Sequence, residues 1–330
     1  MFRYFGPPGT GKTTTLLNHV EQLLSEGTPP NQIGYFAFTR KAAHEARDRA
    51  VARFGLDPDK DFIFFRTLHS LAFQLLGISG AEVVKETHLK EFSKIVGVNL
   101  TESIEAVEDE GFVTFRSNHP IMRAIDLART TDHGPMWAYN RMDLVETSYH
   151  FKHIFSEYEK FKKQNGLRDF TDMLVGLAEN EAVIPQLKVV FLDEAQDLTA
   201  LQWKVAHLLD DKAEKFYIAG DDDQGIFGFT GAEVTRFIKL EGASEVLTQS
   251  HRIPRSVWTL ADRVSSRIRK RQKKEWSPRD ATGSTRFVHD HYGIDFTDQW
   301  LILAQANYML NDIGAYLKTQ GYFFERFNSP

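Results

Sequence analysis

The segment "GPPGTGKT" (6–13) constrains what this chain can fold into more than any other part of its sequence. Glycine, four variable residues, glycine, lysine and threonine follow a strand-like run at 2–5 and lead into a helix-like run at 12–27. This is the context of a phosphate-binding loop. Average residue usage gives such a pattern about one chance in a hundred in a chain of this length. A nucleotide site is therefore a stronger interpretation than a glycine-rich turn with an incidental lysine.

The chemistry of that site follows from the loop. Its glycines let backbone N–H groups crowd around phosphates, and the following helix adds the positive end of its dipole. Lys12 is expected to reach the β- and γ-phosphates, and Thr13 to bind Mg²⁺. The predicted nucleotide-binding residues of the loop are Gly6, Pro7, Pro8, Gly9, Thr10, Gly11, Lys12, Thr13 and Thr14.

A second motif supplies the acids that such a site needs. In "VVFLDEAQD" (189–197) an apolar strand carries Asp193 to its carboxyl end, where ligands bind in open α/β sheets. Asp193 is predicted to hold Mg²⁺ on the side opposite Thr13, and Glu194 to polarise the attacking water. The alternative is an acidic loop that merely follows a strand, and the phosphate-binding loop makes this alternative weaker.

Alternating apolar and amphipathic runs organise the rest of the chain. Strands are expected at 2–5, 33–39, 62–67, 188–193 and 215–220, and helices at 12–27, 40–55 and 69–77. This alternation predicts a parallel α/β sheet. From about 80 to 165 the strand rhythm stops, and runs such as 149–164 predict a mostly helical, polar insertion. A further block of strands is expected at 244–250, 300–305 and 322–327.

Composition narrows the class of protein but leaves the partner open. The chain has 330 residues, is 42% hydrophobic and 26% charged, and contains no cysteine. These values are typical of a soluble protein of about two domains in a reducing, cytoplasmic setting. No apolar run approaches the roughly 18 residues of a membrane helix, and a loop beginning at Gly6 leaves no room for a cleaved targeting peptide. The net charge of −5 still permits a local stripe that binds nucleic acid.

With both nucleotide motifs placed, the chain resembles the UvrD/Rep family of superfamily I DNA helicases, with the motifs in family order. "YFAFTRKAAHEAR" (35–47) is similar to motif Ia, "RTLHSLAF" (66–73) to motif Ib and "DEAQDLTALQ" (193–202) to motif II. "GDDDQGIFGFTGA" (220–232) is similar to motif III and "LTQSHRIP" (247–254) to motif IV. "LRDFTDML" (167–174) resembles the stretch that closes the inserted domain of the family.

The resemblance implies a RecA-like P-loop NTPase domain with a helical insertion, followed by an incomplete second RecA-like domain. The expected divisions are 1–79 and 166–243 for the first domain, 80–165 for the insertion and 244–330 for the second. The implied cofactors are ATP and Mg²⁺. The implied partners are single-stranded DNA and single-strand/double-strand junctions, with no membrane.

In the family, motif III joins the nucleotide to the DNA strand. The resemblance gives Gln224 the role of sensing the γ-phosphate and the attacking water, and Phe227 and Phe229 the role of stacking on bases. An aromatic face accepts any base at about 1–3 kcal/mol each and so binds without reading sequence. The alternative is that both phenylalanines pack in the core.

The resemblance also assigns further contacts with the DNA strand, by matched position in the motifs. Phe38 and Thr39 of motif Ia are expected to lie along one groove with Thr67 and His69 of motif Ib. The two threonines suit phosphate oxygens, and Phe38 suits a base. His69 taken alone would more often be a structural hydrogen-bonding residue than a ligand contact.

Three more residues are assigned to the nucleotide by resemblance. Arg252 matches the motif IV arginine that stabilises charge on the γ-phosphate, and His251 stands where the family often stacks a tyrosine on adenine. Arg47 matches a motif Ia arginine near the γ-phosphate, although a surface ion pair is nearly as good an interpretation. The basic run "RIRKRQKK" (267–274) could bind phosphates, but a solvated helix end is the better prediction.

Three departures from the family pattern qualify the resemblance. No glutamine motif that reads adenine precedes Gly6, so a preference for ATP over other nucleotides is not assured. Thr230 stands where motif III normally has arginine, which removes one γ-phosphate contact. No candidate for motif V or VI precedes Pro330. We therefore expect either a second polypeptide that supplies them or a longer protein.

Three functions are compatible with these features. The first is an ATP-dependent DNA helicase that moves 3′ to 5′ and needs the missing motifs for unwinding. The second is a single-strand-dependent ATPase or binding switch without unwinding activity. The third is a nucleotide kinase or other phosphoryl transferase, which would leave motifs Ia, Ib and III unexplained.

Overall fold

The computed structural model describes residues 1–38, 40–101 and 104–326. The chain forms two compact units, Met1–Thr282 and Gly283–Pro330. Within the described residues, no helix combines the length and the apolar character needed to cross a bilayer.

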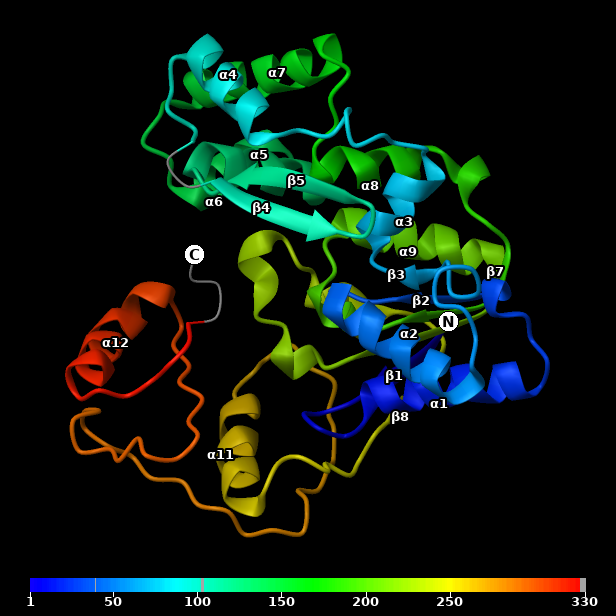
Figure 1. Cartoon of the computed structure of the whole chain (residues 1–330), viewed down its shortest axis with the longest axis vertical. Coiled ribbons are helices and arrows are strands. Elements are labelled where there is room, and N and C mark those ends of the chain that lie inside the picture. Colours follow the sequence, from blue (N-terminus) through cyan, green and yellow to red (C-terminus); the bar gives the residue numbers. More distant parts are fainter. Residues whose placement is uncertain (39, 102–103, 327–330) are drawn as a thin grey trace. The chain divides into compact units, whose positions relative to one another are not determined.

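A six-stranded sheet forms the centre of the first unit (Figure 1). Its strands are β1 (Phe2–Phe5), β2 (Ile33–Phe36), β3 (Phe65–Arg66), β6 (Leu187–Leu192), β7 (Ala213–Gly220) and β8 (Ala243–Val246). Their order is β3-β2-β6-β7-β1-β8, and every pairing is parallel. The expected parallel α/β sheet is thus confirmed, although the strand expected at 62–67 is limited to β3.

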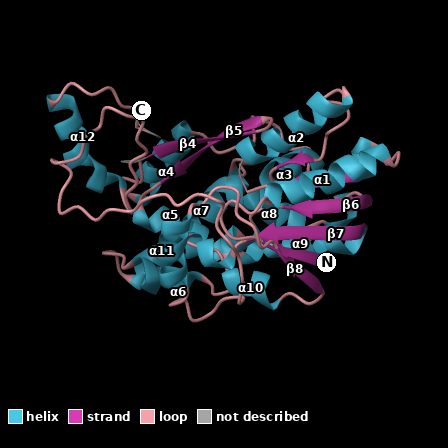
Figure 2. Ribbon diagram, turned by 90° about the horizontal axis from the view of Figure 1, so that it is seen from below, coloured by secondary structure: helices cyan, strands magenta, loops and turns pink. Residues whose placement is uncertain are grey.

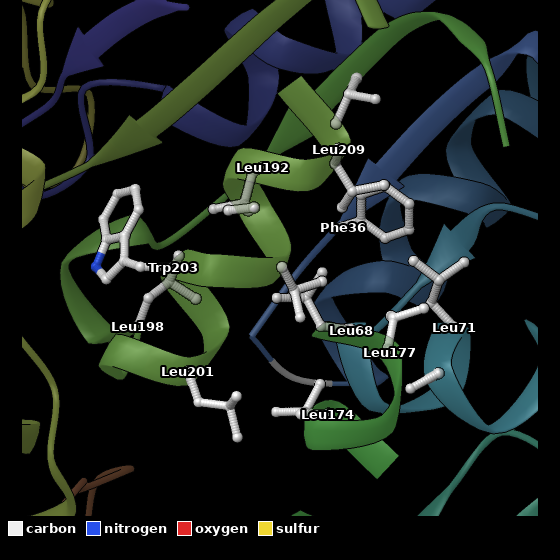
Figure 3. Close-up of a cluster of buried hydrophobic side chains, with 14 of the residues drawn as sticks. Phe36, Leu68, Leu71, Leu174, Leu177, Leu192, Leu198, Leu201, Trp203 and Leu209 are labelled. Carbon is white, nitrogen blue, oxygen red and sulfur yellow. The ribbon is translucent and has the colours of Figure 1, made fainter. Parts of the chain in front are cut away.

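Helices cover both faces of this sheet (Figure 2). The helices of the sheet region are α1 (Lys12–Ser25), α2 (Arg40–Phe54), α3 (Leu68–Leu75), α8 (Phe170–Glu179), α9 (Ala200–Lys212) and α10 (Val234–Lys239). Adjacent residues of a strand point to opposite faces, so Tyr35 joins the core under α1 and α2 while Phe36 joins the core under α3, α8 and α9. Figure 3 shows the second core, with Phe36 and Leu192 among leucines of α3, α8 and α9.

Strand register brings the functional loops to one edge of the sheet. Phe5 pairs with Gly220, and Leu192 pairs with both Phe36 and Ile218. The loops after β1, β2, β6 and β7 therefore leave the sheet at neighbouring points. This edge is where parallel α/β sheets bind ligands.

The inserted segment contains a β-hairpin that the mostly helical prediction missed. Strands β4 (Ile104–Asp109) and β5 (Phe112–Ser117) form an antiparallel ribbon separate from the large sheet (Figure 1). The other elements are α4 (Glu86–Val96), α5 (Pro120–Thr130), α6 (Pro135–Met142) and α7 (Ser148–Gln164). Half of the residues of β4 are acidic, which obscures the strand pattern, but Gly111 supplies the positive φ (89°) of a tight turn.

Two of the late strands expected from the sequence are wrong. Residues 300–305 and the described residues 322–326 form no strand; the helices after β8 are α11 (Arg255–Ser265) and α12 (Leu310–Thr319). Leu301 and Leu303 are 82% and 80% exposed, so no neighbouring strand covers this apolar run. The expected boundary at 244 falls inside β8, and the assignment of 244–330 to a second RecA-like domain stays a prediction.

Candidate nucleotide and nucleic-acid site

The phosphate-binding loop leaves β1 and turns directly into α1. Gly6 N–H donates to the Gly220 carbonyl at the end of β7 (3.0 Å), which ties the loop to the sheet. Gly9 and Gly11 have φ values of 73° and 86°, a region that favours glycine. Lys12 Nζ donates to the Gly6 carbonyl (3.0 Å), and a Cβ on Gly6 would lie 2.2 Å from Lys12 Cγ. Glycine at position 6 thus makes room for the lysine to fold over the loop.

The remaining loop residues shape its two sides. Thr10 is buried, and its Oγ1 donates to the Pro7 carbonyl (2.8 Å). The Pro8 carbonyl accepts a hydrogen bond from Ser250 Oγ (2.7 Å). Thr14 is exposed at the first turn of α1.

Thr13 and Asp193 meet as the two motifs predict. Thr13 Oγ1 donates to Asp193 Oδ2 (2.6 Å), and Tyr35 OH donates to the same oxygen (3.1 Å). Asp193 is buried, and burial, followed by the charge of Glu194, raises the pKa of its carboxyl. A buried carboxylate with hydroxyl partners needs a positive charge nearby, and a hydroxyl and a carboxylate beside phosphates are the few protein ligands that Mg²⁺ usually takes. These residues fit Mg²⁺.

A hydrogen-bonded chain links the two residues predicted to handle water. Gln196 Nε2 donates to Glu194 Oε2 (2.8 Å), and Gln196 Oε1 accepts from Asp221 N–H (2.9 Å). Gln224 Nε2 in turn donates to Asp221 Oδ2 (2.6 Å). Glu194 has a φ of 55°, an uncommon backbone state for a non-glycine residue that persists only where neighbours hold it. Gln196 and Asp221 were missed by sequence reasoning, although both lie inside the quoted motifs.

The segment that resembles motif IV lies on the phosphate-binding loop. His251 N–H donates to the Gly9 carbonyl (2.8 Å). A Cβ added to Gly9 would lie 2.3 Å from Arg252 Cβ and 3.0 Å from Ser250 Oγ, so only glycine permits this approach. The side chains of His251 and Arg252 are exposed beside the loop. Both residues predicted to contact the nucleotide from this segment therefore lie beside the phosphate-binding loop, and their role toward the nucleotide stays a prediction.

Arg47 is not brought to the nucleotide loop in the described part of the chain. Its Nη1 lies 3.2 Å from Glu110 Oε1, and its Nε lies 3.7 Å from Asp48 Oδ1. The ion pair considered as the alternative is the arrangement found, and its partner belongs to the β4–β5 turn.

Three predicted base-stacking rings line one cavity of about 640 Å³. The ring centroids of Phe38 and Phe227 are 5.9 Å apart, and those of Phe227 and Phe229 are 6.1 Å apart. Phe229 is 56% exposed, and the other two rings are half-buried. None of the three is sealed in the core. Thr39, predicted beside Phe38, lies outside the described residues.

Thr67 and His69 reach the same cavity but have partners within the protein. Thr67 Oγ1 donates to Asp109 Oδ2 (2.5 Å). The His69 ring stacks on Phe170 with centroids 3.5 Å apart. Burial, followed by the charge of Arg116, holds the pKa of His69 well below its ordinary value. His69 is therefore neutral at pH 7 and offers no positive charge to a phosphate.

The β4–β5 hairpin brings acids to this cavity, which the sequence did not indicate. Glu105, Glu108 and Asp109 all line it. Arg40 Nη1 lies 3.7 Å from Glu108 Oε2, and the turn residue Glu110 contacts His44 Nε2 at 2.5 Å. Negative charges thus line this cavity together with Arg40, Arg116 and Arg123.

Comparisons with known proteins show similarity to one domain family and to several helicases. The UvrD/REP helicase N-terminal domain matches residues 5–244. The chain is 25% identical over 330 residues to a "Probable DNA helicase" of Mycoplasma pneumoniae, an alignment that covers 92% of this chain and 61% of that protein. It is 24% identical over 245 residues to "ATP-dependent DNA helicase Rep" of Buchnera aphidicola, covering 71% of this chain and 35% of the relative.

A third relative gives the same picture. "ATP-dependent DNA helicase PcrA" of Staphylococcus aureus is 24% identical over 285 residues, covering 81% of this chain and 38% of that protein. The chain thus spans between about a third and three fifths of the length of these relatives.

Proposed function

We propose, from the premise that this chain belongs to the UvrD/REP helicase N-terminal domain family, that it couples ATP hydrolysis to movement along single-stranded DNA. The proposed direction is 3′ to 5′, and the proposed substrates are single strands and their junctions with duplex. The names of the relatives, a probable DNA helicase, Rep and PcrA, support this proposal.

One observation carries the proposal. The loop after β7 contributes to two neighbouring sites: Gln224 is hydrogen-bonded through Asp221 to the residues around Glu194, and Phe227 and Phe229 line the aromatic cavity. Only a few residues of this loop separate Gln224 from the two rings. A change in the contacts of Gln224 can therefore shift the rings. Stacking on rings is sequence-tolerant, as a motor that passes along any strand requires.

The residues would divide the chemistry as follows. Lys12 and the loop amides bind the phosphates, and Thr13 and Asp193 would hold Mg²⁺, which supplies charge neutralisation at the phosphates. Glu194 orients and polarises the attacking water, and Gln224 contacts that water and the γ-phosphate. Arg252 stabilises the charge that develops during transfer.

The test is the rate of ATP hydrolysis with and without an oligo-dT strand. We expect the strand to accelerate hydrolysis by the unaltered chain. Phe229→Ala should keep basal hydrolysis and lose most of the acceleration, because one stacked base contributes about 1–3 kcal/mol. Phe287→Ala, which removes another highly exposed ring (86%), is the matched control. Equal acceleration in all three proteins would rule out the stacking role.

A narrower function, strand-dependent ATP hydrolysis without unwinding, stands beside the first proposal. It is supported by the same loop, in which Gln224 and the rings of Phe227 and Phe229 lie together, and it requires no strand separation. A strand-separation assay on a duplex with a 3′ overhang distinguishes the two, alone and with added polypeptide that carries motifs V and VI.

A further inference from the structure

The basic run 267–274 ends in a lysine that is completely buried. Lys274 has a side-chain exposure of 0%, and its Nζ lies 2.8 Å from Asp221 Oδ1 and 3.0 Å from Asp223 Oδ2. It also contacts Asp222 Oδ1. Neither a phosphate-binding patch nor a solvated helix end describes this arrangement.

Two further residues of the run also contact the motif III acids. Arg271 Nη2 donates to Asp223 Oδ2 (2.6 Å), and the Gln272 N–H donates to Asp222 Oδ2 (2.6 Å). Two cations thus face three carboxylates, of which those of Asp221 and Asp222 are 1% and 0% exposed. The acids at the start of motif III are therefore held from one side by a segment about fifty residues further along the chain.

Asp221 connects Lys274 to the residues of the candidate nucleotide site. Its Oδ1 faces Lys274, while its Oδ2 accepts the hydrogen bond of Gln224 (2.6 Å). Its backbone N–H donates to Gln196, which in turn donates to Glu194. Lys274 thus stands at the end of a chain of polar contacts that reaches both residues proposed to handle the attacking water.

The positive charge of Lys274 stabilises this series of polar contacts. Burial lowers the pKa of a lysine, but the neighbouring carboxylates, with Asp221 foremost, outweigh burial and raise the pKa of Lys274. Without that charge the Asp221 carboxylate would be buried with no compensating cation, which is costly unless the group protonates or moves. Either response alters the acceptor that Gln224 uses.

We propose that Lys274 is a positioning residue for ATP hydrolysis, which fixes Gln224 through Asp221. The inference rests on the proposed function, since it assumes that Gln224 acts on the nucleotide. The same polypeptide segment carries Arg252 against the phosphate-binding loop and Lys274 against motif III. Movement of this segment would therefore change both contacts together.

The first test compares Lys274→Met with Lys273→Met, a matched control because Lys273 is 89% exposed. For strand-stimulated hydrolysis, we expect Lys274→Met to lower kcat about 10- to 100-fold while KM changes less than about threefold, as for an interaction that acts in the transition state. Lys273→Met should match the unaltered chain in both constants. A rise in KM with kcat preserved would overturn the proposal.

A double-substitution cycle separates positioning from general damage. If Lys274 acts through Gln224, Lys274→Met should lower kcat no more than about twofold further in a Gln224→Ala background. Fully additive losses would overturn the proposal. Asp221→Asn interrupts the same series of contacts with a side chain of nearly equal size. It replaces Lys274→Met in this test if that variant does not fold. An unchanged kcat in Asp221→Asn would also overturn the proposal.

A measurement that does not require ATP hydrolysis distinguishes the proposal for Lys274 from the proposed function of the chain. Amide hydrogen exchange of peptides covering 221–226 should be faster in Lys274→Met than in the unaltered chain, and unchanged in Lys273→Met. If the unaltered chain hydrolyses no ATP, the proposed function fails, while the exchange result still decides whether Lys274 holds motif III. Equal exchange in all three proteins would sink the inference.

Discussion

At the scale of single residues, Lys12 makes one structural contact and has a proposed role in ATP hydrolysis. Its Nζ donates to the Gly6 carbonyl, a single hydrogen bond from a charged group whose loss costs about 1.5–3 kcal/mol. Lys12→Ala should therefore still fold but lower kcat for hydrolysis by about 10²–10³-fold, as removal of one transition-state donor does. Phosphate release and a thermal melt measure the two effects. Lys60→Ala, at a side chain 84% exposed, is the control and should change neither.

Asp197 gives the nucleotide site a pH-dependent stability. Burial, and then the charge of Glu194, raise its pKa to about 6, against the small opposing effect of Gln196 and Lys12. The folded state therefore holds its proton more tightly than the unfolded state, so stability should fall as pH rises from about 4 to about 6 and stay lower above that. Its Oδ1 is buried and accepts no hydrogen bond from the described residues.

Asp197→Asn should remove this penalty. We expect the variant to be more stable than the unaltered chain at pH 8, with the difference vanishing below about pH 4, where both side chains are uncharged. Urea unfolding at pH 4 and pH 8 measures it. A variant less stable at pH 8 would show that the Asp197 carboxylate has a favourable partner in solution.

At the scale of elements, the β4–β5 hairpin adds negative charge to the cavity it lines, which would weaken the proposed binding of a single strand there. Glu105 and Glu108 are both exposed and both reach that cavity, so their charges repel phosphates. Replacing both with glutamine should tighten binding of oligo-dT about 5- to 10-fold at low salt, and the gain should shrink as salt screens the charges. Fluorescence anisotropy of a labelled strand measures this without requiring hydrolysis.

The control for the hairpin changes net charge equally elsewhere in the inserted segment. Glu91 is exposed and Glu86 is half-buried on α4, and neither lines the cavity. Their double replacement by glutamine should tighten binding much less, because charges beyond about 10 Å are largely screened at moderate salt. Equal gains in both double variants would mean that overall charge, and not the hairpin, decides affinity.

The elements also mark how far the sequence could be interpreted. The phosphate-binding loop, β6 and the parallel sheet follow from local pattern, because glycine spacing and apolar runs carry their own signal. The hairpin and Lys274 do not: β4 is too polar to stand out, and the environment of Lys274 exists only once distant segments meet. The apolar run at 300–305 predicted a strand, but a strand needs a pairing partner that this unit does not present among its described residues.

At the scale of the whole molecule, a net charge of −5 offers no long-range attraction to DNA, so the proposed affinity for a single strand would depend mainly on the aromatic cavity. Stacking contacts depend less on salt than phosphate contacts do. A chain that binds this way must tighten or loosen its hold through the loop shared with the nucleotide. Nucleotide and strand are then linked ligands of one protein.

Linkage makes the final prediction quantitative. If a non-hydrolysable ATP analogue raises affinity for oligo-dT by some factor, oligo-dT must raise affinity for the analogue by the same factor, since coupling at equilibrium is reciprocal. We expect each ligand to change the affinity for the other by a factor of about 5 to 150, as an increase or as a decrease, which is usual for coupled sites. Phe229→Ala should bring it close to one, while Phe287→Ala should leave it unchanged. Titrations of each ligand with and without the other measure both factors, and a factor of one in the unaltered chain would mean that the shared loop transmits nothing.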